Sequence, residues 1–262
     1  MKIILSRKGF DTSNGKCPNP IFPDGTLLSL PIPSEDSLSF ADLSYKGLSY
    51  NKILSGLNPK ENYSGCHLDP DIRKDARIVT VPKWVPIFGQ IGSAQGVLHN
   101  NNIGKDDLFL FFGRFQKTQQ AEDGRYSYVR GEPCLHVIYG YLQVEKVLTK
   151  PEDVEKYWWH PHADLSRLNE KNNALYLARK TLSFDKSKPG FGVFNFDEDR
   201  VLTLEDRPMA TWREIAALMP SNITSGRKNS EKGDGLYYKG IWQELVLREN
   251  SLSEEWAKSL FI

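Results

Sequence analysis

Two apolar runs in the middle of the chain restrict its fold more than any other feature. Residues 107–112 (Asp-Leu-Phe-Leu-Phe-Phe) and residues 135–144 are rich in the aromatic and β-branched side chains that favour strands. The stretch 114–132 between them is polar, which predicts a long hairpin loop. The two runs therefore predict an antiparallel pair of strands.

Shorter segments add further strands and small helices to this pair. Residues 2–6, 78–81 and 237–247 each have the apolar or β-branched content of a strand. Residues 69–71 predict a helical turn, with Asp69 as its N-cap and a proline at the first helical position. We expect an α+β fold with a strand-rich mixed or antiparallel sheet, short peripheral helices and long irregular loops. A barrel-like closure of the sheet is an alternative.

Length and charge limit the organisation and the partners of the chain. A β-rich chain of 262 residues commonly forms one domain, so we expect a single domain over residues 1–262. Lysine and arginine (34) balance aspartate and glutamate (33), so no global positive field drives non-specific binding to nucleic acid. Any contact with phosphates must come from a local patch.

The cysteines and the N-terminus predict a cytoplasmic protein without a membrane segment. Cys17, Cys66 and Cys134 have neither the spacing of a zinc site nor the even number of a disulfide framework. The apolar run that follows Met1 is too short for a signal peptide or a membrane span.

The first group of candidate site residues follows the first predicted strand. Arg7 and Lys8 come directly after its apolar residues, at a strand end of the kind that presents ligand-binding groups in α/β folds. Arg7 is suited to a bidentate contact with a phosphate or carboxylate, and Asp11 to a hydroxyl or a base edge. The alternative is a structural ion pair between Arg7 and Asp11 within the loop.

The second group lies between residues 65 and 73. Asp69 and Asp71 stand beside His67 and Cys66, a combination suited to a metal site or to acid–base catalysis, and Arg73 is a candidate for holding phosphate or sugar. The alternative is that both acids stabilise the start of a helical turn. A Cys66–His67 nucleophile pair is disfavoured, because neighbours on a strand point to opposite faces.

The third group is the string Trp-Trp-His-Pro-His-Ala-Asp at 158–164. In an extended segment His160 and His162 share one face, which suits two ligands of one metal. The tandem tryptophans fit equally well with an aromatic-lined base or sugar pocket that includes Trp159. A plain surface loop is the third possibility, and we assign no residue to a metal.

Glutamine and glutamate residues complete the candidate set. Glu244 lies in an apolar strand, where a buried carboxylate requires a partner such as Arg7, Arg73 or a ligand; a structural buried pair is the alternative. Gln243 beside it, and Gln90 and Gln95 in the loop predicted to lead into a short helix, are candidates for contacts with a nucleotide.

Several familiar catalytic motifs are missing. The sequence contains no GxxxxGK[ST] loop, GxGxxG unit, GxSxG elbow or HExxH helix. It therefore gives no support to a P-loop NTPase, a Rossmann dehydrogenase, an α/β-hydrolase or a zincin.

Several strings together resemble the third nucleotide-modification-associated domain family. They are residues 1–11, 23–33, 68–73, 106–115 and 159–164, which span nearly the whole chain. The family takes its name from bacterial and phage gene neighbourhoods linked to modified DNA bases. The resemblance implies a role in making, removing or recognising modified nucleotides, with nucleotide or DNA as partner, and it specifies no reaction or cofactor.

Three functional hypotheses follow. The first, which we favour, is an enzyme that binds a nucleotide or an extruded base, with Asp69, Asp71 and Glu244 as catalytic groups. The second is a non-catalytic reader of modified bases that stacks them on Trp84, Trp158 or Trp159. The third is a structural subunit of a DNA-modification or phage-defence system, bound to partner proteins.

Overall fold

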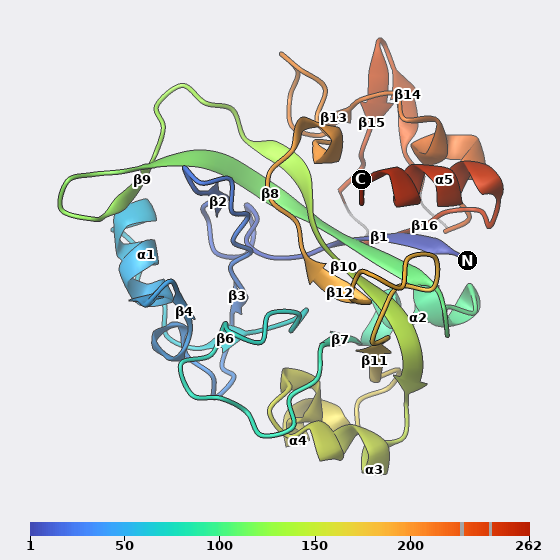
Figure 1. Cartoon of the computed structure of the whole chain (residues 1–262), viewed down its shortest axis with the longest axis horizontal. Helices are drawn as coiled ribbons and strands as arrows, with labels where there is room; N and C mark the ends of the chain where they lie inside the picture. The colour runs from blue at the N-terminus through green and yellow to red at the C-terminus, as the bar shows by residue number, and fades with distance from the viewer. Residues whose placement is uncertain (226–227, 241–242) are drawn as a thin grey trace.

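Two long antiparallel strands form the centre of the fold. The computed structural model describes residues 1–225, 228–240 and 243–262 (Figure 1). In it β8 (Leu108–Gln120) pairs antiparallel with β10 (Leu135–Leu148), which confirms the predicted pair. The predicted long loop over 114–132 is wrong, because β8 continues to Gln120 and then pairs with β9 (Tyr126–Tyr128). Its polar residues alternate with buried ones, so a half-exposed strand accommodates them.

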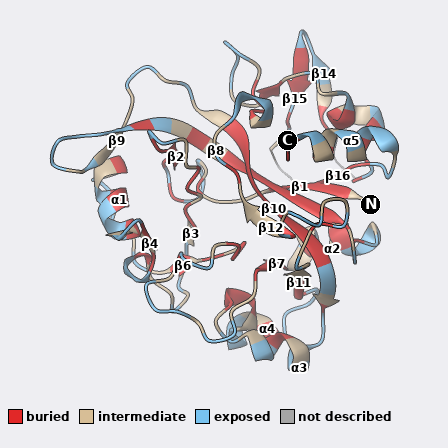
Figure 2. Ribbon diagram, viewed as in Figure 1, coloured by how far each residue is buried: buried red, intermediate tan, exposed pale blue. Residues whose placement is uncertain are grey.

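Both faces of β8 are buried. Leu108 and Leu110 belong to one hydrophobic cluster, and Phe109 and Phe111 belong to another on the opposite face. Successive side chains of a strand point to opposite faces, so residues 108–111 place two leucines in one core and two phenylalanines in the other. Figure 2 shows β1, β8 and β10 as the most continuously buried ribbons of the molecule.

The main sheet is mixed and open. Its path runs β16 (Glu244–Val246), β1 (Ile3–Arg7), β8, β10, β11 (Ala174–Ala178) and β7 (Ile87–Gln90), and β2 (Asn19–Ile21), β9 and β12 (Phe191–Val193) attach to it. Strands β1 and β2 run parallel to β8, and the other pairings are antiparallel. The α+β prediction is confirmed. Within the described residues the sheet does not close, so the barrel-like alternative is not formed.

The remaining elements surround this sheet. The small sheets are β13 (Thr211–Trp212), β15 (Gly235–Tyr237) and β14 (Ser230–Lys232); β3 (Ile32–Pro33) with β6 (Cys66–His67); and β4 (Ser44–Tyr45) with β5 (Leu48–Ser49). The α-helices are α1 (Tyr50–Leu57), α2 (Gly92–Asn100), α3 (Pro151–Val154), α4 (Leu165–Leu168) and α5 (Ser251–Ser259). The 3-10 helices are Phe40–Asp42, Glu155–Tyr157, Pro161–Ala163, Glu198–Arg200, Ala216–Leu218 and Pro220–Asn222. Helices α1, α3, α4 and α5 lie at the periphery (Figure 1), and no helix of the described chain has the length and apolarity needed to cross a membrane.

Three local predictions differ from the structure. Residues 69–71 form no helical turn, because the Asp69 carboxylate accepts a hydrogen bond from Gly89 and the backbone of Asp71 pairs with that of Ile87. Residues 78–81 form no strand; Ile78 and Val79 are exposed, and a strand needs a partner as well as β-branched side chains. Of the strand predicted over 237–247, Tyr237 ends β15 and Glu244–Val246 form β16, and residues 238–240 are not in a strand; residues 241–242 lie outside the described residues.

The sheet brings its two terminal strands together at one place. Although β7 and β16 lie at opposite ends of the strand order, Gln90 Nε2 at the end of β7 donates to Glu244 Oε1 at the start of β16, at 2.6 Å. Lys8, which directly follows β1, lies with its Nζ 4.5 Å from the centroid of the Phe88 ring on β7. Residues that are far apart in the sequence therefore converge beside these strand ends.

Candidate functional site

A polar cleft opens where β1, β7 and the start of β16 converge. Its volume is about 200 Å³. The lining residues come from the ends of strands and from the loops between them: Arg7, Lys8, Gly9, Asp11, Asn14, Ile32, His67, Asp69, Gln90, Ile91, His162, Arg167 and Gln243. Seven of the predicted site residues are in this set, namely Arg7, Lys8, Asp11, Asp69, Gln90, His162 and Gln243, and so is His67, which was named beside Asp69.

A buried lysine lies between two buried carboxylates at the base of the cleft. Lys8 Nζ is 4.0 Å from Asp69 Oδ2 and 3.8 Å from Glu244 Oε1, and all three side chains are at most 9% exposed. A buried charge is unfavourable unless an opposite charge lies close to it. The Lys8 ammonium group therefore stabilises the two carboxylates, and the carboxylates stabilise the ammonium group. The residues Lys8, Asp69 and Glu244 are called the buried triad below.

The two carboxylates of the buried triad have pKa values that move in opposite directions. Burial raises the pKa of Glu244, against the smaller opposing effects of Lys8, Ser6 and Gln90. Burial also acts to raise the pKa of Asp69, but His160 and Lys8 outweigh it and hold the pKa of this carboxyl well below its usual range. Asp69 is therefore ionised at neutral pH, and Glu244 retains a proton to a higher pH than an ordinary glutamate.

The hydrogen bonds of Glu244 leave one of its oxygens without a partner. Oε1 accepts from Ser6 Oγ at 2.9 Å and from Gln90 Nε2 at 2.6 Å. Among the described residues, the buried Oε2 has no hydrogen-bond partner. Glu244 lies behind the cleft lining, so it acts on the cleft through Lys8 and Gln90.

Three of the five histidines of the chain gather around Asp69. His67 and His162 line the cleft, and their ring centroids are 5.3 Å apart. His160 Nε2 lies 3.4 Å from Asp69 Oδ1 without meeting the geometry of a hydrogen bond. Burial lowers the pKa of His162 to about 3, so this ring is neutral at physiological pH.

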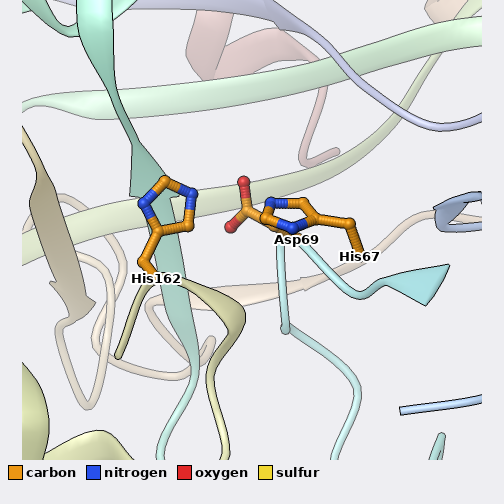
Figure 3. Close-up of side chains that lie close together, drawn as sticks. All are labelled: His67, Asp69 and His162. Atoms are coloured by element: carbon orange, nitrogen blue, oxygen red, sulfur yellow. The ribbon is translucent and has the colours of Figure 1, made fainter. Parts of the chain in front are cut away.

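Among the described residues, His67, Asp69 and His162 form the one group whose potential metal-ligating atoms all lie within 4.8 Å of one another. Figure 3 shows the Asp69 carboxylate between the two imidazole rings. His67 and Asp69 come from β6 and the loop after it, and His162 comes from the 3-10 helix Pro161–Ala163.

Gly89 on β7 allows the histidines to pack against the sheet. A Cβ atom at this position would lie 2.4 Å from Cδ2 of His162 and 2.8 Å from Cε1 of His160. No real Cβ contact is that short, so a side chain here would displace both rings. A glycine inside a strand commonly marks such a close approach.

Several other predicted site residues lie outside the cleft lining. Asp71 belongs to a structural ion-pair network, and Arg73 lies beside a separate small void. The Asp71 carboxylate is buried, and Oδ2 accepts from Arg77 Nη1 at 2.6 Å and from Trp84 Nε1 at 3.0 Å. Arg73 bonds to the Tyr50 hydroxyl and to Asp75, beside a void of about 30 Å³ that has room for water only.

Gln95 and Trp159 also lie away from the cleft. Gln95 is buried in α2 and accepts a hydrogen bond from the Tyr176 hydroxyl at 3.0 Å. Trp159 packs with α3 and its neighbours in a separate hydrophobic cluster. The extended conformation expected for 160–164 is wrong, since Pro161–Ala163 is a 3-10 helix and His160 Nδ1 accepts from the His162 amide at 3.3 Å.

Sequence reasoning missed the partners that hold the histidines. Asp36 Oδ2 lies 2.8 Å from His67 Nδ1, and Asp36 also pairs with Arg167. Asn173 Oδ1 lies 2.8 Å from His162 Nδ1. His67 was named beside Asp69 in a combination suited to a metal site, but it was not included among the predicted site residues. Asp36 and Asn173 had no signal in the sequence, because only the tertiary fold brings them to the rings.

Comparisons with known proteins identify the family. The family model described as nucleotide modification associated domain 3 matches residues 2–248. Searches of curated proteins and of solved structures give no match. The family match covers almost the whole chain and includes every residue of the cleft. The chain therefore belongs to the nucleotide modification associated domain 3 family.

Proposed function

We propose that this chain binds a nucleotide, either free or extruded from DNA, in the cleft and chemically modifies it. The observation that carries the proposal is the combination, in one cleft, of cationic side chains at the opening and the buried triad at the base. The family's association with nucleotide modification supports the choice of ligand.

Arg7 is the group proposed to bind the phosphate. Its side chain is 25% exposed, and its ion pair with Asp11 is long, at 3.7 Å. A guanidinium presents five donors in a planar fork, so this pair leaves donors for a phosphate. Arg167 also lines the cleft, but it is held by Asp36 and by the Pro161 carbonyl.

Asp69 is the group proposed to act on the ligand. It lines the cleft, it is ionised, and its carboxylate is held by the Gly89 amide at 2.7 Å. Glu244 has its pKa moved in the opposite direction, and paired groups with divergent pKa values are typical of acid–base assignments in enzymes. In this proposal Glu244 positions and tunes Lys8, while Asp71 has a structural role with Arg77.

The cleft lining favours an enzyme over a reader. A reader would stack the base on tryptophans, yet Trp84, Trp158 and Trp159 are all absent from the lining formed by the described residues. Larger hollows exist, such as one of about 550 Å³ beside α5, but its lining contains none of the buried triad. Buried ionisable groups and partly exposed arginines meet in the polar cleft instead.

Binding is tested by titrating the protein with nucleoside monophosphates and with a short single-stranded DNA. We expect Arg7→Gln to weaken the binding of the preferred ligand at least about tenfold, because a charge-assisted hydrogen bond contributes about 1.5–3 kcal/mol. Arg207→Gln is the matched control, since Arg207 pairs with Asp234 on the surface and does not line the cleft. Wild-type protein that binds no member of the panel, or an Arg7→Gln variant that binds as well as wild type, would contradict the proposal.

Catalysis is tested by mass spectrometry of the nucleosides in DNA and in nucleotide pools that have been incubated with the protein. A changed nucleoside with wild-type protein, and none with Asp69→Asn, is the expected result. Identical nucleoside profiles with and without wild-type protein, together with intact binding, would favour the reader.

A further inference from the structure

The hydrogen bonds made by Nδ1 of His67 and of His162 determine the tautomer of each imidazole ring. The tautomer in turn decides whether Nε2, which faces the cleft, has a free lone pair. His67 Nδ1 lies 2.8 Å from Asp36 Oδ2, and Oδ1 of the same carboxyl group accepts a hydrogen bond from the Arg167 guanidinium. A carboxylate paired with a guanidinium only accepts hydrogen bonds, so His67 Nδ1 carries the hydrogen. In the neutral ring Nε2 then has the free lone pair.

The same argument applies to His162. Asn173 Nδ2 donates to the backbone carbonyl of His162 at 2.9 Å, so the amide oxygen of Asn173 faces the ring. That oxygen lies 2.8 Å from His162 Nδ1, which must therefore donate. Nε2 of His162 is left as an acceptor, and in Figure 3 both rings point toward the Asp69 carboxylate.

Asp69 has one oxygen held by the protein and one available to a ligand. Oδ1 accepts from the Gly89 amide at 2.7 Å and faces His160 at 3.4 Å. Oδ2 makes only a long contact with Lys8 Nζ, at 4.0 Å, among the described residues. A carboxylate oxygen and two imidazole lone pairs are therefore directed into one space at the cleft.

We infer that His67, Asp69 and His162 form a binding site for one first-row divalent transition cation. Two imidazole nitrogens with a single carboxylate oxygen match ions such as zinc, iron(II) or cobalt(II), whereas magnesium and calcium prefer oxygen ligands. Metal-binding histidines usually donate their other ring nitrogen to a carboxylate or carbonyl oxygen, as both rings do here. The three side chains leave coordination positions open toward the cleft, where a substrate or water would bind.

The spacing of the ligand atoms is close to what one ion needs. The atoms of the three residues lie within 4.8 Å of one another, and ligand atoms at about 2.1 Å from one ion are at most about 4.2 Å apart, so a pair at the 4.8 Å limit would approach by about half an ångström. His67 has the most room for such a movement, because its side chain is 14% exposed and those of Asp69 and His162 are at most 3% exposed. Lys8 does not need to leave, because Glu244 at 3.8 Å and the Phe88 ring at 4.5 Å keep holding its ammonium group.

The test uses the full chain without a histidine tag, freed of metal with a chelator and titrated with cobalt(II) in the absence of any nucleotide. We expect one cobalt per chain, visible d–d absorption bands of an imidazole-bound ion, a higher unfolding temperature, and displacement of cobalt by zinc. The measurement is independent of the proposed function, because no nucleotide or turnover is involved.

Two variants each replace one imidazole ligand with an amide that has no imidazole lone pair. We expect His67→Gln and His162→Gln each to bind cobalt at least about 100-fold more weakly than wild type. His99→Gln is the matched control, because His99 is exposed on α2 and belongs to no such group in the described chain. Circular dichroism and thermal unfolding in chelator establish that each variant is folded.

Two results would overturn the inference. One is wild-type protein that takes up well under one cobalt per chain at saturating concentration. The other is a folded His67→Gln variant that binds cobalt with wild-type affinity and an unchanged spectrum. If His162→Gln does not fold, His67→Gln alone decides, because the His67 side chain is 14% exposed and so is the less buried of the two rings.

Discussion

Replacing Gly89 with alanine probes how closely the histidine rings pack against β7. The new methyl group would lie 2.4 and 2.6 Å from two atoms of the His162 ring and 2.8 Å from His160 Cε1. Neither ring is free to move away, since His160 is 1% and His162 is 2% exposed and Asn173 holds the latter. The substitution therefore forces a shift of the loop that carries both histidines.

The size of the effect follows from two opposing contributions. Overpacking a close-packed site lowers the free energy of unfolding by about 1–3 kcal/mol. Alanine also lowers the conformational entropy of the unfolded chain, which raises the free energy of unfolding by about 0.4–1 kcal/mol. We expect the free energy of unfolding to fall by about 1–2 kcal/mol. At about 2–4 °C per kcal/mol for a chain of this size, the unfolding temperature falls by about 2–8 °C.

The assay is urea denaturation combined with cobalt titration. Gly104→Ala is the control, because a methyl group there would meet no atom within 4 Å and the backbone at Gly104 is not left-handed. We expect this control to stay within about 0.5 kcal/mol of wild type. Gly89→Ala should lose both stability and cobalt affinity. Wild-type stability together with wild-type cobalt binding in Gly89→Ala would refute the close packing of the rings and the argument built on it.

Three further predictions concern groups outside the cleft lining. Asp71→Ala leaves the buried Arg77 guanidinium without its carboxylate, so the free energy of unfolding should fall by about 3–5 kcal/mol in urea denaturation; an unchanged midpoint would contradict a structural role. Burial lowers the pKa of His136 to about 3, against about 6.5 when unfolded, so its contribution to stability is full above pH 6.5 and is lost as the pH falls. The stability advantage of wild type over His136→Gln should therefore shrink by about 2 kcal/mol between about pH 7 and pH 5, and an advantage that stays constant over this range would contradict a buried, neutral imidazole. Asn250→Ala removes the N-cap of α5 and should cost about 1 kcal/mol, measured by thermal unfolding; an unaltered unfolding temperature would contradict the cap.

Patterns within one segment predicted the centre of the fold well. The alternation of residues 107–112 and the apolar run 135–144 were sufficient for β8 and β10, because a strand buried on both faces shows its character in its own side chains. Prediction failed where a segment depends on a partner. Residues 78–81 are β-branched but pair with no strand of the described chain, and the polar half of β8 became a strand because β2 and β9 pair with it.

The sequence was also sufficient to predict part of the candidate site. Residue type and position along the chain were enough to select Arg7, Lys8, Asp69, His162 and Glu244, since charged and imidazole groups next to apolar strands need partners. The family membership was also readable from the strings of the sequence.

Only the tertiary structure decided which of these groups meet. Asp69 and Asp71 are two residues apart, yet one lines the cleft and the other is buried against Arg77. The protonated nitrogen of His67 depends on Asp36, which lies 31 residues earlier in the sequence. The physical reason is that burial, hydrogen-bond partners and close approaches such as that at Gly89 arise between segments, and the spacing of residues within one segment contains no information about them.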